Sequence, residues 1–155
     1  LKSNNPSIYF EKIISLNLQD PFFKNLNNPF CDSHEQEEIR WSELQINNDF
    51  DLGGNLPIPN GHKNISEILR NISRINANMG EDDLISILIS SNFRRNKEII
   101  DKLIMLPNLK DTKDYISKLA SKIKIADFSF LTDMPKEKIR AEKSKIYKQI
   151  IHKCK

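Results

Sequence analysis

The sequence predicts an all-α protein, an irregular bundle of about six to seven short helices with an N-terminal helix and loop extension. Three observations support this class. Apolar residues recur at spacings of three and four along much of the chain, which is the period of an amphipathic helix. Prolines, glycines and asparagines interrupt this pattern between the apolar stretches. Acidic residues gather where some of the apolar stretches begin, as the helix dipole favours.

Two helices are expected in the N-terminal third. Asn5-Pro6 is a favourable combination of N-cap and first helical residue, so the first helix is predicted at about 6–17. The second helix is predicted at 33–46. There Ser33 and Gln36 have the spacing of a capping box, in which each side chain satisfies a free backbone N–H of the helix start.

The stretch 47–63 breaks the helical pattern. It holds three of the four glycines and two of the seven prolines, so a long loop or an internal linker is expected. Its Leu56-Pro57-Ile58-Pro59 run predicts an extended strip that lies against a neighbouring surface. The expected organisation is therefore an extension at 1–63 that packs on a helical bundle at 64–155, which ends in a basic helix.

The most regular pattern follows this loop. The segment 81–90 is apolar nearly all round, which leaves a short buried strand as the alternative, but its three leading acids favour a helix. Five helices are expected here. The first carries the apolar stripe from Ile65 to Ile75, the second spans 81–90, and the third begins at Asn92 and ends before Pro107. The fourth begins at Asp111 and the fifth at Asp133-Pro135.

Composition excludes several classes of protein. No run approaches the roughly 20 apolar residues that a membrane-spanning helix needs. Cys31 and Cys154 are the only cysteines, so no disulfide framework is expected, and two free thiols point to a reducing compartment, the cytoplasm or the nucleus. Cys31-x-x-His34 has acceptable zinc spacing, but His152-x-Cys154 is too tight, so no metal site is predicted.

No catalytic signature is present. The sequence contains no nucleophile elbow, phosphate-binding loop, dinucleotide-binding glycine pattern or zinc-protease motif. His62 lies in the loop rich in glycine and proline with no serine or cysteine motif beside it. We therefore expect neither an enzyme nor a cofactor.

Charge is distributed unevenly, although the net charge is only +3. Residues 1–62 carry a net charge of −5, residues 63–134 carry +2, and residues 135–155 carry +6. This asymmetry predicts that the basic C-terminal helix meets an acidic partner or folds back on the acidic N-terminal third.

These features favour a protein–protein interaction domain, a scaffold or a subunit of a larger intracellular complex. Apolar residues of a groove or of the extended strip would bury against the partner, and the charge asymmetry would set orientation and association rate. Aromatic residues and arginines most often anchor interfaces. The predicted contact residues are Trp41, Phe50, Leu56, Ile58, Arg94 and Arg95; the single tryptophan has a core position as its alternative.

The first alternative is a nucleic-acid-associated module that uses the basic C-terminal helix, whose cations would contact phosphates. Against it, Tyr147 is the only aromatic residue of that helix, and base stacking needs more. The residues predicted for this alternative are Arg94, Arg95, Lys136, Lys138, Arg140, Lys143, Lys145 and Lys148. Two competing hypotheses concern the arginine pair: it binds a phosphate or carboxylate at a helix start, or it pairs with Glu81, Asp82 or Asp83.

The second alternative concerns the segment 20–32, DPFFKNLNNPFCD. Asn28-Pro29-Phe30 resembles the tripeptide that endocytic EH domains bind, and Asp20-Pro21-Phe22 resembles the tripeptide taken by clathrin-adaptor appendage domains. An Asn or Asp before proline makes a tight turn that presents the phenylalanine. The resemblance implies an endocytic adaptor ligand. The competing interpretation is a structural anchor, because Phe22, Phe23, Leu26 and Phe30 are dense enough to form a core plug.

Overall fold

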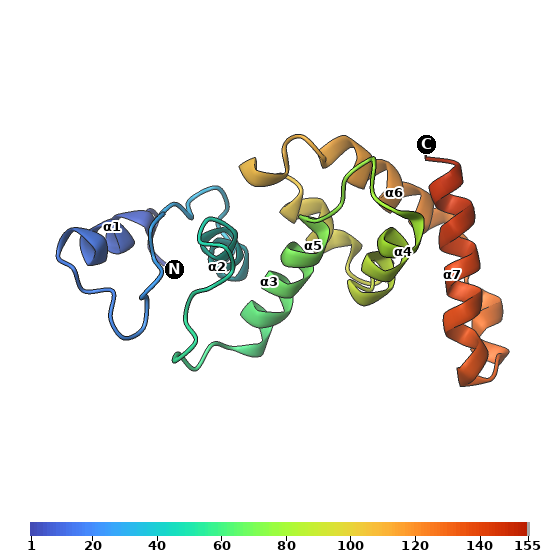
Figure 1. Cartoon of the computed structure of the whole chain (residues 1–155), viewed down its shortest axis with the longest axis horizontal. Helices are drawn as coiled ribbons and strands as arrows, with labels where there is room; N and C mark the ends of the chain where they lie inside the picture. Colours follow the sequence, from blue (N-terminus) through green and yellow to red (C-terminus); the bar gives the residue numbers. More distant parts are fainter. Residues whose placement is uncertain (155) are drawn as a thin grey trace. The chain divides into compact units, whose positions relative to one another are not determined.

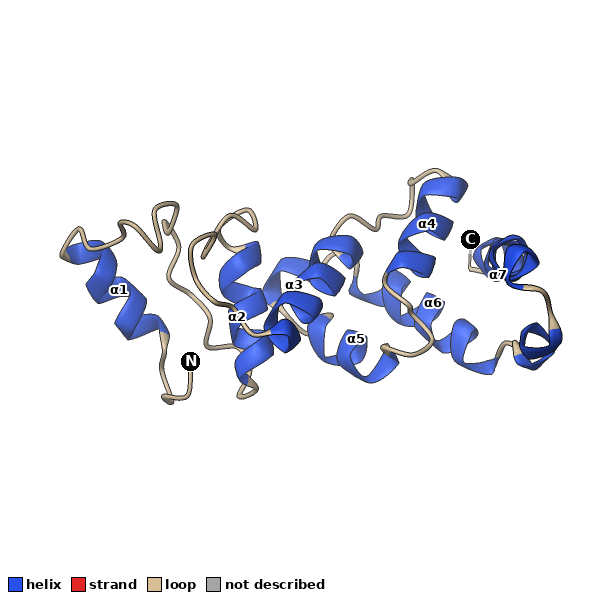
Figure 2. Cartoon of the chain, turned by 90° about the horizontal axis from the view of Figure 1, so that it is seen from below, coloured by secondary structure: helices blue, strands red, loops and turns tan. Residues whose placement is uncertain are grey.

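The computed structural model describes residues 1–154 and confirms the all-α class (Figure 1, Figure 2). None of the described residues belongs to a strand. The α helices within this range are α1 (Ser7–Ser15), α2 (Glu37–Ile46), α3 (Asn60–Ile72), α4 (Glu81–Ser90), α5 (Lys97–Leu103), α6 (Lys113–Ile125) and α7 (Lys136–His152). Two short 3-10 helices, η1 (Pro107–Leu109) and η2 (Ser129–Asp133), connect the later helices.

The chain divides into two compact units. The first unit comprises Leu1–Arg70 together with Leu106–Asn108, and the second comprises Asn71–Met105 and the chain from Leu109 onward. The boundary predicted between residues 63 and 64 falls inside α3. The packing of residues 1–63 on the bundle stays a prediction.

In the first unit, the start of α1 is satisfied by a residue distant in sequence. The helix begins at Ser7, and its N-cap residue is Pro6, which has no side-chain oxygen to offer. The carboxylate of Asp32 accepts the backbone N–H of Ser7 at 3.1 Å. A negative charge at this helix end is also favoured by the helix dipole.

Helix α2 begins later than predicted, at Glu37 instead of residue 33, and the capping-box prediction was wrong. The buried Glu43 carboxylate recruits Ser33 instead, accepting its backbone N–H at 3.0 Å and also its hydroxyl. Because burial of a carboxylate without partners is costly, this long-range contact outweighs the local cap.

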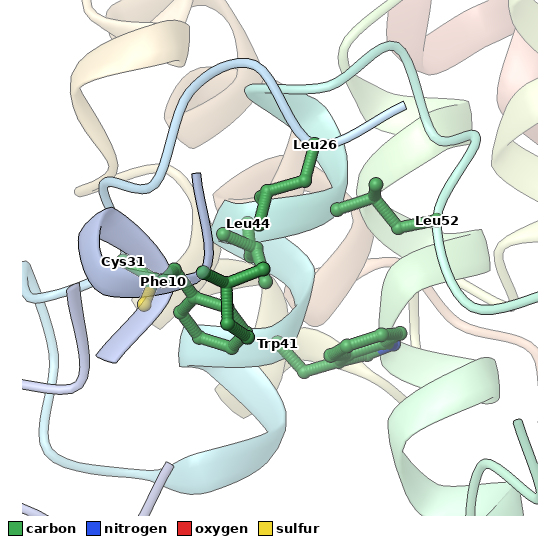
Figure 3. Packing of buried hydrophobic residues seen from close by; sticks show 7 residues of the cluster. Phe10, Leu26, Cys31, Trp41, Leu44 and Leu52 are labelled. Atoms are coloured by element: carbon green, nitrogen blue, oxygen red, sulfur yellow. The ribbon is translucent and has the colours of Figure 1, made fainter. Parts of the chain in front are cut away.

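The core of the first unit is built by α1, the loop after it, α2 and the loop after α2. The rings of Phe10 and Phe23 meet edge to face, with centroids 5.6 Å apart. Figure 3 shows side chains of the buried cluster packed together. The cluster comprises Phe10, Ile13, Leu26, Cys31, Trp41, Leu44 and Leu52.

A buried guanidinium ties the N-terminal segment to α2. Arg40 is only 6% exposed. Its Nη1 donates to the carbonyl oxygens of Leu1 and Ser3 at 2.7 and 2.5 Å, and its Nε donates to the carbonyl of His34. These charge-assisted hydrogen bonds compensate for the removal of the cation from water.

The second unit is built around α7, which packs against α4 and α6, while α5 packs on α6 (Figure 1). The helical interpretation of residues 81–90 is confirmed. The acids in the first turn of α4 are where the helix dipole favours them. The fully buried side chains of this unit include Leu84, Leu88, Ile100, Leu103, Ile116, Leu119, Ile123 and Ile151.

Asn92 does not open a helix. It lies in a turn with φ of 45°, a conformation that asparagine tolerates better than most residues, and α5 begins only at Lys97. The backbone N–H of Phe93 donates to the carbonyl of Leu88, and the phenyl ring is buried. The burial of Phe93 therefore accompanies a turn at the place where the local sequence predicts the start of a helix.

The buried Cys31 thiol is expected to lower the stability of the folded protein as the pH becomes alkaline. Burial raises its pKa from 9.0 to about 11, whereas the hydrogen bond from the Ser7 hydroxyl and the charge of the chain's N-terminus act in the opposite direction. Between these two pH values the unfolded chain loses the thiol proton and the folded chain keeps it. We expect this contribution to be intact below pH 9 and to be lost as the pH rises through 11, by up to about 3 kcal/mol.

Urea unfolding at a series of alkaline pH values measures this effect. The comparison is with Cys31→Ala, which lacks the thiol and has every other ionisable group in common with the parent. The difference in unfolding free energy between the two proteins should shrink as the pH rises. A difference that is constant from pH 8 to 11 would contradict the prediction.

Among residues 1–154, no helix combines the length and the apolar character required to cross a membrane.

Candidate functional site

Some residues of the segment 20–32 are buried in the core of the first unit, and others are exposed to solvent. Leu26 and Cys31 are fully buried, and Phe23 packs against the core of the first unit. In contrast, the two phenylalanines that directly follow proline point partly to solvent: Phe22 is 48% exposed and Phe30 is 45% exposed. The core-plug interpretation therefore describes only the first group of residues.

The second Pro-Phe step is held in a defined conformation. The side-chain oxygen of Asn28 accepts the N–H of Phe30 at 3.1 Å, which closes the turn around the proline. Two asparagines at the end of α2 fix its backbone. Asn48 accepts the N–H of Asn28 at 2.9 Å, and Asn47 donates to the carbonyl of Phe30 at 2.8 Å. The phenyl ring of Phe30 is thus presented from an ordered backbone.

The first unit also contains a pocket of about 290 Å³, which we call the Trp41 pocket. Its walls come from α2, the loop that follows α2, and the first three turns of α3. Four of the six predicted contact residues, Trp41, Phe50, Leu56 and Ile58, line this pocket. The other residues that line it are Gln45, Leu52, Gly53, Gly54, Lys63, Ser66, Glu67 and Arg70.

Glycine allows the loop to lie against the indole ring. Gly53 has φ of +74°, in the left-handed region that side chains disfavour. A Cβ atom at this position would lie 3.1 Å from Cη2 of Trp41 and 3.4 Å from Cδ1 of Ile58. Gln45 holds the next turn of the loop by donating to the carbonyl of Leu52 at 3.0 Å. The indole therefore supports the loop, and Trp41 itself is only 5% exposed.

An arginine orders the opposite side of the same pocket. The guanidinium of Arg70 lies 5.0 Å from the ring centroid of Phe50 and donates to the Phe50 carbonyl at 2.9 Å. Its other nitrogen lies 3.7 Å from the carboxylate of Glu67, one turn earlier on α3. These contacts fix Phe50, which has φ of 58°, at the edge of the pocket.

The second unit contains a larger pocket of about 590 Å³, which we call the basic pocket. It lies among the turn after α4, η2 and α7. Arg94 and Arg95, the remaining two predicted contact residues, line it together with Lys143 of the nucleic-acid set. The other residues that line it are Asn92, Phe128, Leu131, Thr132, Ile139 and Tyr147.

The arginine pair lies in a turn, at 91–96, and not at the start of a helix. The guanidinium of Arg94 lies 4.9 Å from the ring centroid of Phe128. Of the acids proposed as its partners, Glu81 faces α7 instead: its carboxylate oxygens lie 3.7 Å from Nζ of Lys148 and 3.2 Å from Nε2 of His152.

One carboxylate lies within electrostatic reach of Arg94. The pKa of Asp127 is lowered, first by hydrogen bonds from Ser129 and to a smaller extent by the charge of Arg94. The pKa of the Tyr147 phenol, in contrast, is raised by burial against the same pocket. The basic pocket therefore combines exposed cations at its edge with buried rings beneath them.

The basic residues of α7 differ in their exposure to solvent and in their ion pairing. Lys143 is half-buried in the basic pocket, whereas Lys136, Lys138 and Arg140 are exposed. Two of the remaining cations are in ion pairs: Nζ of Lys145 lies 2.6 Å from the carboxylate of Glu142, and Lys148 pairs with Glu81.

The sequence analysis did not predict several of the residues that line the two pockets. In the basic pocket, Phe128, Leu131 and Tyr147 come from segments far apart in the chain. In the Trp41 pocket, Gln45 and Ser66 are ordinary helical residues with no local signal. The sequence predicts only a loop or linker around the glycine pair at 53–54, and the one available clue to the pocket is that this loop follows the helix that carries the tryptophan.

Comparison with known proteins adds no relative: no protein-family model, curated sequence or solved structure matches this chain. Within residues 1–154, histidine, cysteine and acidic side chains form no group of three that would hold a metal ion.

Proposed function

We propose that this chain is a protein-interaction domain, a scaffold or subunit of a larger assembly in the cytoplasm or nucleus. One observation supports this most directly: Trp41, Phe50, Leu56 and Ile58 line a single pocket of the first unit. Aromatic side chains are frequent anchors of interfaces, and aliphatic surface is removed favourably from water on binding. Their convergence on one concave surface is what a binding site requires.

The occupant we propose is one large apolar side chain from an extended segment of a partner protein. The volume of about 290 Å³ is at the lower end for small-molecule sites, which suits a single side chain better than a cofactor. Leu56 and Ile58 are half-buried, so they have apolar surface left to bury on binding. Trp41 is nearly buried already and supports the floor of the pocket.

Charge at the pocket edge supports a partner segment that is acidic beside its apolar residue. Lys63 and Arg70 line the pocket with only one acid, Glu67, and Glu67 already faces Arg70. Such edge charges mainly affect orientation and association rate, and the apolar side chain supplies most of the binding energy.

Selection from a phage-displayed library of random peptides tests the proposal. The full chain should enrich peptides that share one large apolar residue. A representative synthetic peptide should then bind Leu56→Glu at least roughly tenfold more weakly than the parent, because a carboxylate cannot be desolvated against the indole. Binding to the parent should persist at high salt, since apolar burial dominates it.

Two matched variants make this test specific. Ile125→Glu replaces an apolar residue that is exposed and lies outside the pocket, so it should bind the peptide as the parent does. Phe30→Ala alters the Pro-Phe step and should also have no effect. The proposal fails if no peptide is enriched, or if Leu56→Glu and Ile125→Glu bind the selected peptide equally well.

A second candidate function is an endocytic adaptor ligand acting through Asn28-Pro29-Phe30. The observation in its favour is the closed turn at Asn28 with a half-exposed Phe30 ring. In this case the same set of variants gives the opposite result: an isolated EH domain binds the parent and Leu56→Glu, and Phe30→Ala abolishes binding without lowering stability.

A further inference from the structure

We infer that the basic pocket of the second unit binds an acidic peptide segment of a partner protein, which inserts an apolar side chain between Arg95 and Lys143. This surface lies in a different unit from the Trp41 pocket and shares no lining residue with it. The inference therefore does not depend on what the Trp41 pocket binds.

The charges that line the basic pocket are all of one sign. Arg94, Arg95 and Lys143 line it, and none of the lining residues is an aspartate or glutamate. Arg94 is already engaged by the ring of Phe128 and is near the Asp127 carboxylate. Arg95 and Lys143 are therefore the two cations best placed to meet an incoming carboxylate, which a guanidinium can bind through two parallel hydrogen bonds.

Apolar surface lies beneath these cations. Phe128, Leu131 and Tyr147 are buried, and Ile139 of α7 is half-buried. The volume of about 590 Å³ is within the range of specific binding sites. A purely ionic ligand would leave this apolar surface uncovered, whereas an apolar side chain would remove it from water.

The same geometry disfavours a nucleic acid as the occupant. Single-stranded nucleic acids gain much of their affinity by stacking bases on open aromatic faces. Here the face of Phe128 is covered by Arg94, and Tyr147 is 3% exposed. Lys145 and Lys148 are in ion pairs with Glu142 and Glu81, which reduces the positive surface that α7 offers to phosphates.

Fluorescence anisotropy with defined probes tests this inference on the full chain. The main probe is a short fluorescein-labelled peptide of alternating aspartate and leucine. We expect it to bind the parent, and we expect Arg95→Glu and Lys143→Glu each to weaken binding at least roughly tenfold through lost pairing and new repulsion. Lys138→Glu makes the same charge change on an exposed residue of α7 outside the pocket, and should weaken binding less than about threefold.

Two further probes separate the contributions. A peptide of alternating aspartate and serine has the charge without the apolar side chains, and should bind at least roughly tenfold more weakly. An oligouridine RNA of equal charge should also bind more weakly than the aspartate–leucine peptide. Far-UV circular dichroism should show unchanged helix content for all three variants, because Arg95 and Lys138 are exposed and Lys143 is half-buried.

Four results would each overturn the inference. The aspartate–leucine peptide fails to bind the parent; the Lys138→Glu variant loses as much affinity as Lys143→Glu; the serine-containing peptide binds as tightly as the leucine-containing one; or the RNA binds more tightly than either peptide. The last result would support the nucleic-acid alternative for α7.

Discussion

Replacing Phe93 with alanine should lower the free energy of unfolding by about 3–5 kcal/mol, which is the usual range for removing a buried phenyl ring. Phe93 is 1% exposed and lies in the turn between α4 and α5. Part of the effect is the loss of apolar burial, and part is the cavity left when neighbours do not collapse. Typical domains have a total stability of roughly 5–15 kcal/mol, so this variant is expected to be only marginally folded.

Urea unfolding followed by far-UV circular dichroism measures this effect. Phe130→Ala is the matched control, because Phe130 is 42% exposed and its removal should change stability by less than about 1 kcal/mol. Equal stability of the two variants would contradict the burial of Phe93. Because the same turn carries Arg94 and Arg95, Phe93→Ala should also weaken ligand binding by the basic pocket, so it cannot substitute for the surface variants there.

Replacing Arg40 with methionine should lower the free energy of unfolding by about 2–4 kcal/mol. The substitution keeps much of the side-chain length but removes every hydrogen bond from the guanidinium to Leu1, Ser3 and His34. The loss is smaller than the sum of those bonds, because methionine avoids the cost of burying a cation. Residues 1–4 should become mobile in the variant, since the arginine is what ties their carbonyl groups to α2.

The fluorescence of Trp41 is a suitable probe, because it is the only tryptophan and belongs to the core of the first unit. Urea unfolding monitored this way should show a lower midpoint for Arg40→Met. Lys24→Met is the matched control: Lys24 is exposed, so the same change of a cation to methionine should shift stability by less than about 0.5 kcal/mol. If both variants are as stable as the parent, the prediction is wrong. The hydrogen bonds of Arg40 would then only compensate for the cost of removing its charge from water.

The local sequence pattern predicts a helix in each segment where the structure has an α helix, although not the residues at which α2 and α5 begin. The apolar stripe that includes Ile68, Leu69 and Ile72 lies on α3, and the acids at 81–83 lie in the first turn of α4. Helical periodicity and dipole interactions act between residues three or four positions apart, so they are present in the local sequence. Leu56 and Ile58 were likewise selected from a local pattern, and they do line a pocket.

Tertiary contacts determine how α1 and α2 begin and which distant side chains meet. Asp32 satisfies the start of α1 from 25 residues away, and Ser33 binds Glu43 instead of capping its own helix. Buried polar groups take whichever partner the fold brings within reach, and local sequence cannot rank a distant partner against a near one. The basic pocket follows the same rule: Arg94 meets Phe128 because packing, not spacing, determines which segments become neighbours.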